Sequence, residues 1–493
     1  MLSSSSMSTI VDIVPFLSKN SKLWKACGIR GLFPLENIPG MISLLAGRPN
    51  ASTFPFESIT MKLKPTLAGL PEGEDAFTIR LEDDELTESL QYGMTAGVSR
   101  LINWLENFQT EVHKRELDDS WNVIVGAGSQ ELMYKACEAL INDGDYVLLE
   151  TPVYAYVVCF RGMCEAFIKL SLRGILGFLA ALPCTLVEAN ADSSGLDPAN
   201  LEIILANWET THPGKPYPKL LYTVPSGSNP TGASIPEYRK VEVLKLAKKY
   251  NFLILEDEAY GFLYYGPEGK QARSYFALEP EVNGEAGRVV RFDSFSKVLS
   301  SGMRLGFMTA SPRLSGVVNM ITSNTNLQPS SLAQIMAYAL LSRWGPQGFL
   351  AHCAGVAAFY RTRRDAFERV ARKHLSGLAD WTSPVAGMFL YIKLLVHPDG
   401  RTSDSLKVIL EKAVNKGVLA VPGTAFMPLA GPTPFVRVSF SLIEEDMAEE
   451  ACRRLREAIL DARAEAEGAC EQEKMNPEHG LPPAFNCWFL AEH

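Results

Sequence analysis

Short apolar runs alternate with amphipathic stretches along the chain from about Trp121. Apolar side chains recur at helical spacing from about Gln130 to Leu140, before Gly144, and again in the stretch that Pro236 opens. The runs that have the length and composition of buried strands are 123–125, 146–149, 220–224, 252–255 and 289–292. This alternation predicts an α/β fold whose mostly parallel central sheet is flanked by helices.

The pattern changes after about residue 342, where long helical stretches accompany strand candidates at 388–392 and 436–440. This change indicates a second, smaller α+β domain. The segment 32–56 has irregular Pro and Gly residues, and we expect it to pack against that second domain. The expected division is an N-terminal arm with part of the small domain (1–60), a large domain (61–342), a small domain (343–465) and a disordered tail (466–493).

Polar and charged residues follow several of the predicted strands. The strand at 220–224 leads into the loop SGSNPTG, the strand at 252–255 ends in Glu256 and Asp257, and the strand at 289–292 is followed by Asp293 and Ser294. In open α/β sheets ligands bind at the carboxyl ends of the strands, so a binding site is expected at this edge.

The segment SFSKVLSSGMRLGF, residues 294–307, places Lys297 between serines and shortly before Arg304. This arrangement suits a lysine that forms a Schiff base beside a phosphate group, with Ser294, Ser296 and Arg304 as phosphate ligands. Taken alone, the segment would equally suit a solvated lysine in a serine-rich turn.

A second group consists of Asn229 in NPTG, Asp257 and Tyr260. Asp257 would pair with a protonated ring nitrogen of pyridoxal phosphate (PLP), and Asn229 and Tyr260 would donate to its phenolate oxygen. Each residue alone is more typical of a turn or cap. Their joint order and spacing favour a cofactor site.

These segments together resemble fold-type I PLP enzymes of the class I/II aminotransferase group. Within it, the chain is similar to the aromatic amino acid, 2-aminoadipate and kynurenine aminotransferases, through PGMISLLAGRPN (39–50), LQYGMTAG (90–97), GAGSQELMYKA (126–136) and the SNPTG, DEAY and SFSK blocks. The resemblance covers about residues 24–465 with one interruption.

The resemblance implies roles for individual residues. Lys297 matches the lysine that carries PLP, and Asn229, Asp257 and Tyr260 match the ring-binding groups. Ser129 and Gln130 match phosphate ligands at a helix N-terminus, and Tyr154 matches the aromatic residue stacked on the cofactor ring. Tyr92 resembles a tyrosine that reaches the phosphate of the neighbouring subunit, which implies a homodimer with shared active sites.

Arg437, in FVRVSF, matches the arginine that binds the substrate carboxylate through two parallel hydrogen bonds. Asn229, Arg30 and Gly47 resemble further residues on the substrate side. The chain has LLAGRPN where relatives show a second glycine and an apolar residue before the proline. The sequence therefore does not define the substrate preference on the side of the site that this arm forms.

The interruption is YVVCFRGMCEAFIKLSLR, residues 156–173. Related sequences run from the ring-stacking tyrosine and two small residues directly into a helix like GILGFLAALPC, which this chain resumes at Gly174. We interpret the segment as an aberrant insertion, such as a retained intron translated in frame. The alternative is a genuine surface insertion, because loops tolerate added length.

The amino-acid composition excludes some classes of binding partner. The chain of 493 residues is 47% hydrophobic, and its 47 basic and 56 acidic side chains give a net charge of −9, which argues against nucleic acid as a partner. Nine cysteines without CxxC or histidine spacing indicate no metal site and suit a reducing compartment. Neither a signal peptide nor a membrane span is evident, so a cytoplasmic protein is expected.

The sequence thus predicts a PLP-dependent aminotransferase that moves an amino group from an aromatic amino acid, 2-aminoadipate or kynurenine to 2-oxoglutarate by a ping-pong mechanism. A lyase or decarboxylase would share nearly all of these residues, because the cofactor supplies the chemistry. A product inactivated by residues 156–173 is another alternative. A transcriptional regulator would need a DNA-binding domain ahead of residue 24, where there is no room for one.

Overall fold

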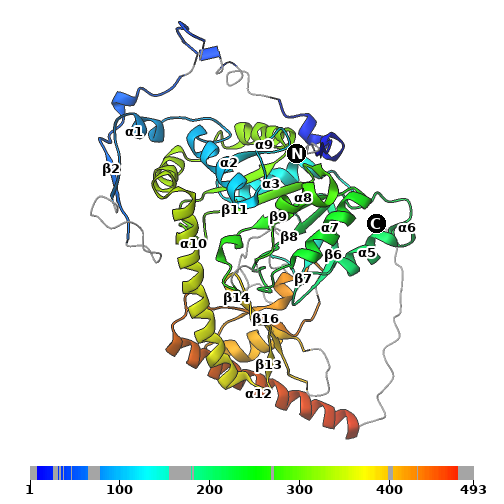
Figure 1. The fold of residues 1–493 in the computed structure, drawn as a ribbon. Coiled ribbons are helices and arrows are strands. Elements are labelled where there is room, and N and C mark those ends of the chain that lie inside the picture. The colour runs from blue at the N-terminus through cyan, green and yellow to red at the C-terminus, as the bar shows by residue number, and fades with distance from the viewer. Residues whose placement is uncertain are drawn as a thin grey trace, which may run out of the picture.

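The computed structural model describes residues 8–25, 32, 35–36, 38–45, 47–64, 78–154, 179, 182–267, 271–397, 403–429 and 431–475. Its centre is an eight-stranded sheet (Figure 1) in the order β4-β12-β11-β9-β8-β5-β6-β7. The strands are β4 (Asn122–Gly126), β5 (Asp145–Thr151), β6 (Cys184–Asp192), β7 (Gly195–Leu196), β8 (Leu220–Thr223), β9 (Leu253–Glu258), β11 (Val289–Ser294) and β12 (Gly306–Ala310).

Strands β6, β5, β8, β9 and β11 run parallel, and β12 is antiparallel to both of its neighbours. The predicted mostly parallel sheet is therefore confirmed. All residues of β8, β9 and β11 are buried, which explains why these strands read as continuous apolar runs. Their carboxyl ends carry the buried polar residues Asp257, Glu258 and Asp293.

Helices flank the sheet, as the helical periodicity predicts. They are α2 (Ser99–His113), α3 (Ser129–Leu140), α5 (Pro198–Ala206), α6 (Trp208–Thr211), α7 (Glu237–Tyr250), α8 (Tyr275–Asn283) and α9 (Pro312–Thr325). Helix α7 packs against α5 and α8, and α3 packs against α9 and the strands β4, β11 and β12. One large apolar core lies between the sheet and these helices.

A smaller domain follows, with an antiparallel sheet in the order β13-β14-β16-β15. Its elements are β13 (Ala379–Asp380), β14 (Phe389–Leu394), α11 (Ser405–Lys407), β15 (Val421–Pro422), β16 (Phe435–Ser439) and α12 (Glu445–Met475). The predicted strands at 388–392 and 436–440 correspond to β14 and β16. This domain has an apolar core of its own.

Helix α10 (Ser331–Leu375) connects the two domains (Figure 1). Its backbone leaves the helical conformation at Gly345, with φ 66° and ψ 174°, directly before Pro346. Beyond this kink, Phe349 and Cys353 are buried in the large core, whereas Phe367 and Ala371 belong to the small one. The helix thus passes from one core to the other, later than the boundary expected at residue 342.

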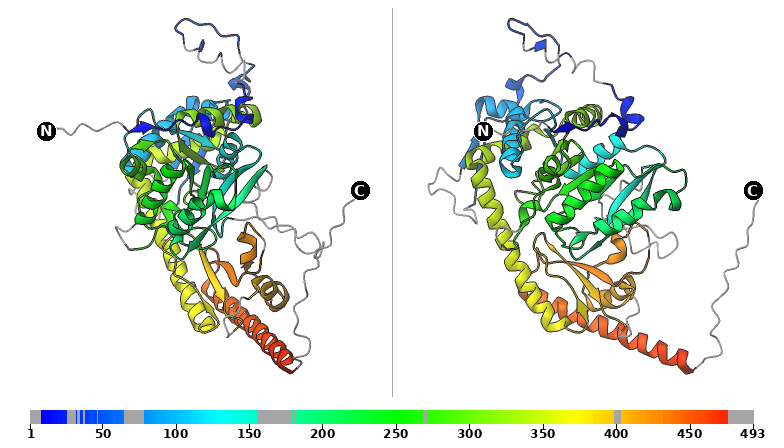
Figure 2. Two further views of the ribbon diagram at one scale, coloured as in Figure 1. Left: turned by 90° about the vertical axis from the view of Figure 1, so that its right-hand side faces the viewer. Right: turned by 45° about the vertical axis from the view of Figure 1, so that its right-hand side comes forward.

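The N-terminal arm joins the large domain. Strand β1 (Thr9–Ile10) pairs with β10 (Glu285–Ala286), and Ile13 and Phe16 are buried in the large core. Further along lie β2 (Ile59–Lys62), β3 (Thr78–Leu81) and α1 (Asp83–Leu90). Figures 1 and 2 place the described part of residues 38–56 at the opposite end of the molecule from the small domain. Within one chain, the expectation that this segment packs against the small domain is therefore not met.

The C-terminal helix is longer than expected. Helix α12 continues to Met475, past the boundary placed at residue 465, because AEAE and EQEK supply strong helix formers on either side of Gly468. The rest of the expected tail, residues 476–493, lies outside the described part. Across the described ranges, no helix combines the length and the apolar character that a bilayer span requires.

Candidate functional site

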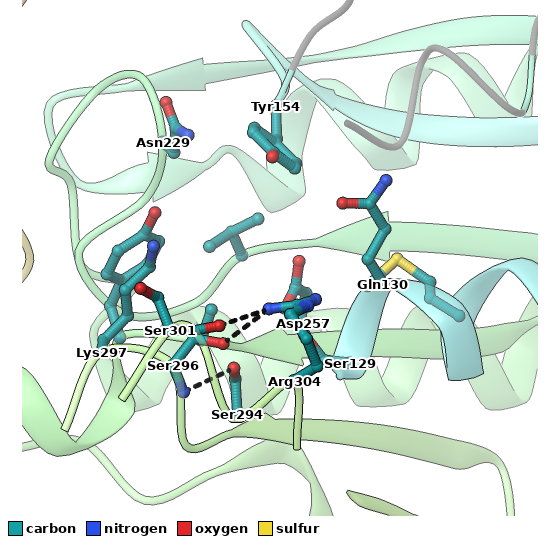
Figure 3. Close-up of a pocket in the computed structure, with 14 residues that line it drawn as sticks. Ser129, Gln130, Tyr154, Asn229, Asp257, Ser294, Ser296, Lys297, Ser301 and Arg304 are labelled. Carbon is teal, nitrogen blue, oxygen red and sulfur yellow. Dashed lines mark hydrogen bonds between the residues drawn. The ribbon is translucent and has the colours of Figure 1, made fainter. Parts of the chain in front are cut away.

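A cavity of about 180 Å³ opens at the carboxyl ends of β8, β9 and β11, beside the N-terminus of α3 (Figure 3). Ten of the predicted site residues line it: Ser129, Gln130, Tyr154, Asn229, Asp257, Tyr260, Ser294, Ser296, Lys297 and Arg304. They come from segments far apart in the chain. The parallel register brings them together, since Asp257 on β9 lies opposite Phe292 on β11, five residues before Lys297.

Asp257 is buried at the cavity wall. Its Oδ2 atom accepts a hydrogen bond from Tyr222 Oη at 2.8 Å, whereas its Oδ1 atom has no partner among the described residues. Burial raises the pKa of this carboxyl to about 6, against the opposing effect of the hydrogen bonds from Tyr222 and the Ala259 amide. A buried hydrogen-bond acceptor without a partner raises the free energy of the folded protein, so a bound group that donates a hydrogen bond to this oxygen would stabilise it.

Lys297 follows β11 and reaches the same cavity. Its Nζ atom lies 5.8 Å from the centre of the Tyr260 ring. Burial and the positive charge of Arg304 lower the pKa of the Lys297 amine, against the opposing charge of Asp257. A lowered pKa increases the fraction of neutral amine, which is the form that attacks a carbonyl group.

The other side of the cavity suits an anion. Ser129 and Gln130 open helix α3, so free backbone amides and the positive end of the helix dipole lie there. Arg304 donates from Nη1 to Ser296 Oγ at 3.3 Å and to the Ser301 carbonyl at 3.1 Å (Figure 3). The position before the helix must be glycine, because Gly128 has φ 97° and a Cβ atom there would lie 2.5 Å from Arg304 Nη2.

Arg437, on β16 of the small domain, lies next to this cavity. Its Nη1 atom donates to Asn229 Oδ1 at 2.8 Å, and its guanidinium carbon lies 4.4 Å from the Phe389 ring centre and 5.2 Å from that of Phe426. Burial lowers its pKa, and its Nε atom has no partner in the described part of the chain. A desolvated guanidinium with an uncommitted N–H suits a carboxylate.

Among the remaining predicted site residues that the structure describes, Arg437 lies beside this cavity, and Tyr92 and Gly47 do not line it. Tyr92 is 55% exposed and lines a separate cavity with Phe54, Gln91 and Gln328. Gly47 is exposed, and a Cβ atom added there would meet no described atom within 4 Å. Arg30 and the segment 156–173 lie outside the described residues.

Sequence reasoning missed several residues of the site. Tyr222 was recognised only as part of a buried strand, and a tyrosine in an otherwise aliphatic run was the available signal. Ser301 contributes a carbonyl to Arg304, which a sequence does not reveal. Phe389 lies on β14, which pairs with the strand β16 of Arg437, and Phe426 precedes β16 in the chain; they flank Arg437 through the fold of the small domain, so no local pattern marks them.

The family model for aminotransferase class I and II matches residues 179–455. The chain belongs to this family. It is 46% identical to the aminotransferase tdiD of Emericella nidulans over 447 residues, which cover 90% of this chain and 95% of that protein. It is 35% identical to the mitochondrial kynurenine/alpha-aminoadipate aminotransferase of Bos taurus over 86% of this chain and 92% of that protein.

Among solved structures, the kynurenine aminotransferase of Pyrococcus horikoshii in complex with PMP, KYN as substrates and KYA as products superimposes with a TM-score of 0.65. It is 28% identical, and the match covers 91% of this chain and 98% of that chain. The chain is thus a PLP-dependent aminotransferase of the fold-type I class. The cavity fits this cofactor, because it combines an amine at Lys297, an unpartnered carboxylate oxygen at Asp257 and an anion site at Ser129 and Arg304.

Proposed function

We propose that this aminotransferase moves the amino group of an aromatic amino acid, 2-aminoadipate or kynurenine to 2-oxoglutarate by a ping-pong mechanism in which Lys297 is the catalytic residue. The observation that carries the proposal is the cavity in which Lys297, Asp257 and the N-terminus of α3 meet, with Arg437 beside it. The names of the relatives, which include kynurenine and alpha-aminoadipate, support the donor class.

PLP supplies an aldehyde and an electron-withdrawing ring. On this proposal the amine of Lys297 would hold the cofactor through its aldehyde, and the free amine would move the proton at the substrate's α-carbon. The carboxylate of Asp257 would stabilise a proton on the ring nitrogen. Tyr154 would pack on the ring, and Asn229 and Tyr260 would donate to its phenolate oxygen.

The phosphate of the cofactor would be held by Ser129, Gln130, Ser294, Ser296 and Arg304. Two supports are independent of each other: the helix N-terminus supplies free amides, and Arg304 supplies a fixed positive charge. The substrate's α-carboxylate would bind Arg437, whose Nη1 atom is held by Asn229. Asn229 then orients both the cofactor and the substrate.

A homodimer with shared sites is part of the proposal. Tyr92 is exposed in the single chain, and so are apolar side chains of the arm, notably Ile42 and Leu44, which are 87% and 97% exposed. A second copy of the chain would cover this surface and receive Tyr92 at its phosphate site. Gly47 and Arg30 of the arm stay predicted substrate contacts. The cytoplasmic location also stays a prediction, and one relative is mitochondrial by name.

A donor panel with 2-oxoglutarate as acceptor tests the proposal most directly. Phenylalanine, tyrosine, 2-aminoadipate and kynurenine are expected as substrates, with glutamate as the common product. In a ping-pong mechanism the first product leaves before the second substrate binds. Double-reciprocal plots of initial rate against donor concentration, at several fixed concentrations of 2-oxoglutarate, should therefore be parallel lines. Intersecting lines would contradict the ping-pong mechanism, and activity limited to donors outside this set would contradict the donor class.

The same panel, run on a variant that lacks residues 156–173, tests the interpretation of that segment. The segment begins two residues after Tyr154, which lines the cavity. An aberrant insertion predicts higher activity and tighter PLP binding after deletion. Equal or lower activity would favour a genuine insertion.

A further inference from the structure

Tyr222 makes a buried contact with the cofactor site that lies outside the roles assigned above. It lies on β8, beside β9, and its hydroxyl donates to Asp257 Oδ2 at 2.8 Å. Both side chains are buried. We propose that Tyr222 is a positioning residue for the cofactor: it holds one oxygen of Asp257 so that the other faces the ring nitrogen of PLP. The inference rests on the proposed role of Asp257.

The geometry explains why such a residue is needed. The terminal torsion of an aspartate is broad and nearly two-fold, so a carboxylate without a second contact samples several orientations. The Tyr222 hydroxyl binds Oδ2 of this carboxylate, and Oδ1 lacks a partner among the described residues. The carboxylate therefore presents one particular oxygen to the cavity before any cofactor binds, which lowers the ordering cost of binding.

The charge of Asp257 depends on the same hydrogen bond. Burial raises the pKa of Asp257, and the nearby carboxylate of Asp293 raises it further, whereas the bond from Tyr222 favours the ionised form. Tyr222 is held as a permanent donor, because burial and the negative charges of Asp257 and Glu150 raise its own pKa well above the usual value. The hydroxyl therefore stabilises the charge that the ring nitrogen requires.

Tyr275 provides a matched control in the same domain. It is fully buried like Tyr222, but its Oη atom has no hydrogen-bond partner within the described ranges. Tyr275→Phe thus removes a buried hydroxyl without touching Asp257, whereas Tyr222→Phe removes the hydroxyl that binds it. Both changes keep the aromatic ring that fills the core.

The experiment measures the dissociation constants of two ligands for the full-length apoenzyme by equilibrium dialysis. One ligand is PLP, and the other is its 1-deaza analogue, in which a CH group replaces the ring nitrogen. Since a hydrogen bond to a charged group is involved, Tyr222→Phe should weaken PLP binding roughly ten- to hundredfold. The same variant should bind the analogue as the wild type does, and Tyr275→Phe should leave both constants unchanged.

Three outcomes would overturn the inference. If Tyr222→Phe binds PLP as tightly as the wild type, the hydrogen bond has no positioning role. If it weakens both ligands alike, including through misfolding, Tyr222 is only structural. If the wild type itself binds PLP and the analogue equally, the proposed contact of Asp257 with the ring nitrogen fails, and the role of Tyr222 fails with it. The wild-type comparison thus separates failure of the Asp257 role from failure of the Tyr222 inference alone.

Discussion

At the scale of single residues, the site is defined by polar atoms that the fold buries and leaves without partners. Asp257 Oδ1 and Arg437 Nε are two of them within the described part of the chain. Burial raises the pKa of Asp257 and lowers the pKa of Arg437, so in both cases it disfavours the charged form. A bound group of opposite charge would stabilise the charged form of each side chain. These two atoms mark where a cationic ring nitrogen and a carboxylate are expected to bind.

Arg437→Lys is expected to raise KM for amino donors and for 2-oxoglutarate roughly ten- to hundredfold, with a smaller change in kcat. Lysine keeps the charge but lacks the planar fork, and it loses the stacked position between Phe389 and Phe426. Steady-state kinetics with both substrates measure the effect. Arg369→Lys is the control, because Arg369 forms an exposed ion pair with Glu445. An unchanged KM for both substrates would argue against Arg437 as the carboxylate site.

The sequence singled out residues that line the cavity more readily than the residues that hold them in place. Lys297, Asp257 and Asn229 follow strands in short motifs whose residue types indicate their chemistry. Tyr222, Phe389 and Phe426 carry no such signal, because a buried aromatic residue is typical of any core. Their contacts arise from strand pairing in the large sheet and from the fold of the small domain.

At the scale of elements, strands with a run of mostly apolar residues were predictable, including β14 and β16 of the small domain, whereas β6 and β12 of the central sheet were not. Strand β6 has exposed and half-buried residues along its length, so it lacks a continuous apolar run. Strand β12 begins at Gly306, inside the segment 294–307 that was interpreted by its chemistry as a phosphate site around Lys297. The kink of α10 depends on Gly345 beside Pro346, but the point at which the helix changes cores depends on tertiary packing.

Neighbouring strands are also linked through a buried carboxyl whose ionisation affects stability. Glu150, on β5, accepts hydrogen bonds from Thr223 Oγ1 and from the Val224 amide beside β8. Burial nevertheless raises its pKa to about 7. The folded state therefore keeps the proton that the unfolded chain releases near the ordinary glutamate pKa of 4.5, and stability falls as the pH rises from there to about 7.

Glu150→Gln should increase the free energy of unfolding at pH 8 by roughly 1–3 kcal/mol, since glutamine carries no charge to bury. Near pH 5 the variant and the wild type should be equally stable, because Glu150 is then protonated in the folded state. Urea unfolding at both pH values measures the difference. Glu202→Gln, at an exposed ion pair with Lys249, is the control. A difference of the same size at both pH values would contradict the role of ionisation.

At the scale of the whole molecule, the N-terminal arm did not follow the sequence prediction. It is anchored on the large domain through β1 and β10 and through Phe16, and the segment around Ile42 and Leu44 is exposed. A sequence pattern shows that these side chains are apolar, but not which molecule covers them. In the proposed homodimer, a second copy of the chain would cover these apolar side chains.

Mixed dimers test whether the sites are shared. Lys297→Ala and Tyr92→Ala should each have little activity alone. When the two variants are co-expressed with different tags, half of the dimers should be mixed, and each mixed dimer should contain one complete site. The expected activity is about a quarter of the wild-type value. Activity no higher than the mean of the two separate variants would show that Tyr92 does not serve the neighbouring subunit.

The central claim is that Lys297 is covalently linked to PLP. Borohydride reduction of the holoenzyme, followed by proteolysis and mass spectrometry of the peptides, tests it directly. The account predicts a single phosphopyridoxyl group, on the peptide that contains Lys297, and none at any position in a Lys297→Ala variant. A label on a different lysine, with Lys297 unmodified, would contradict the account.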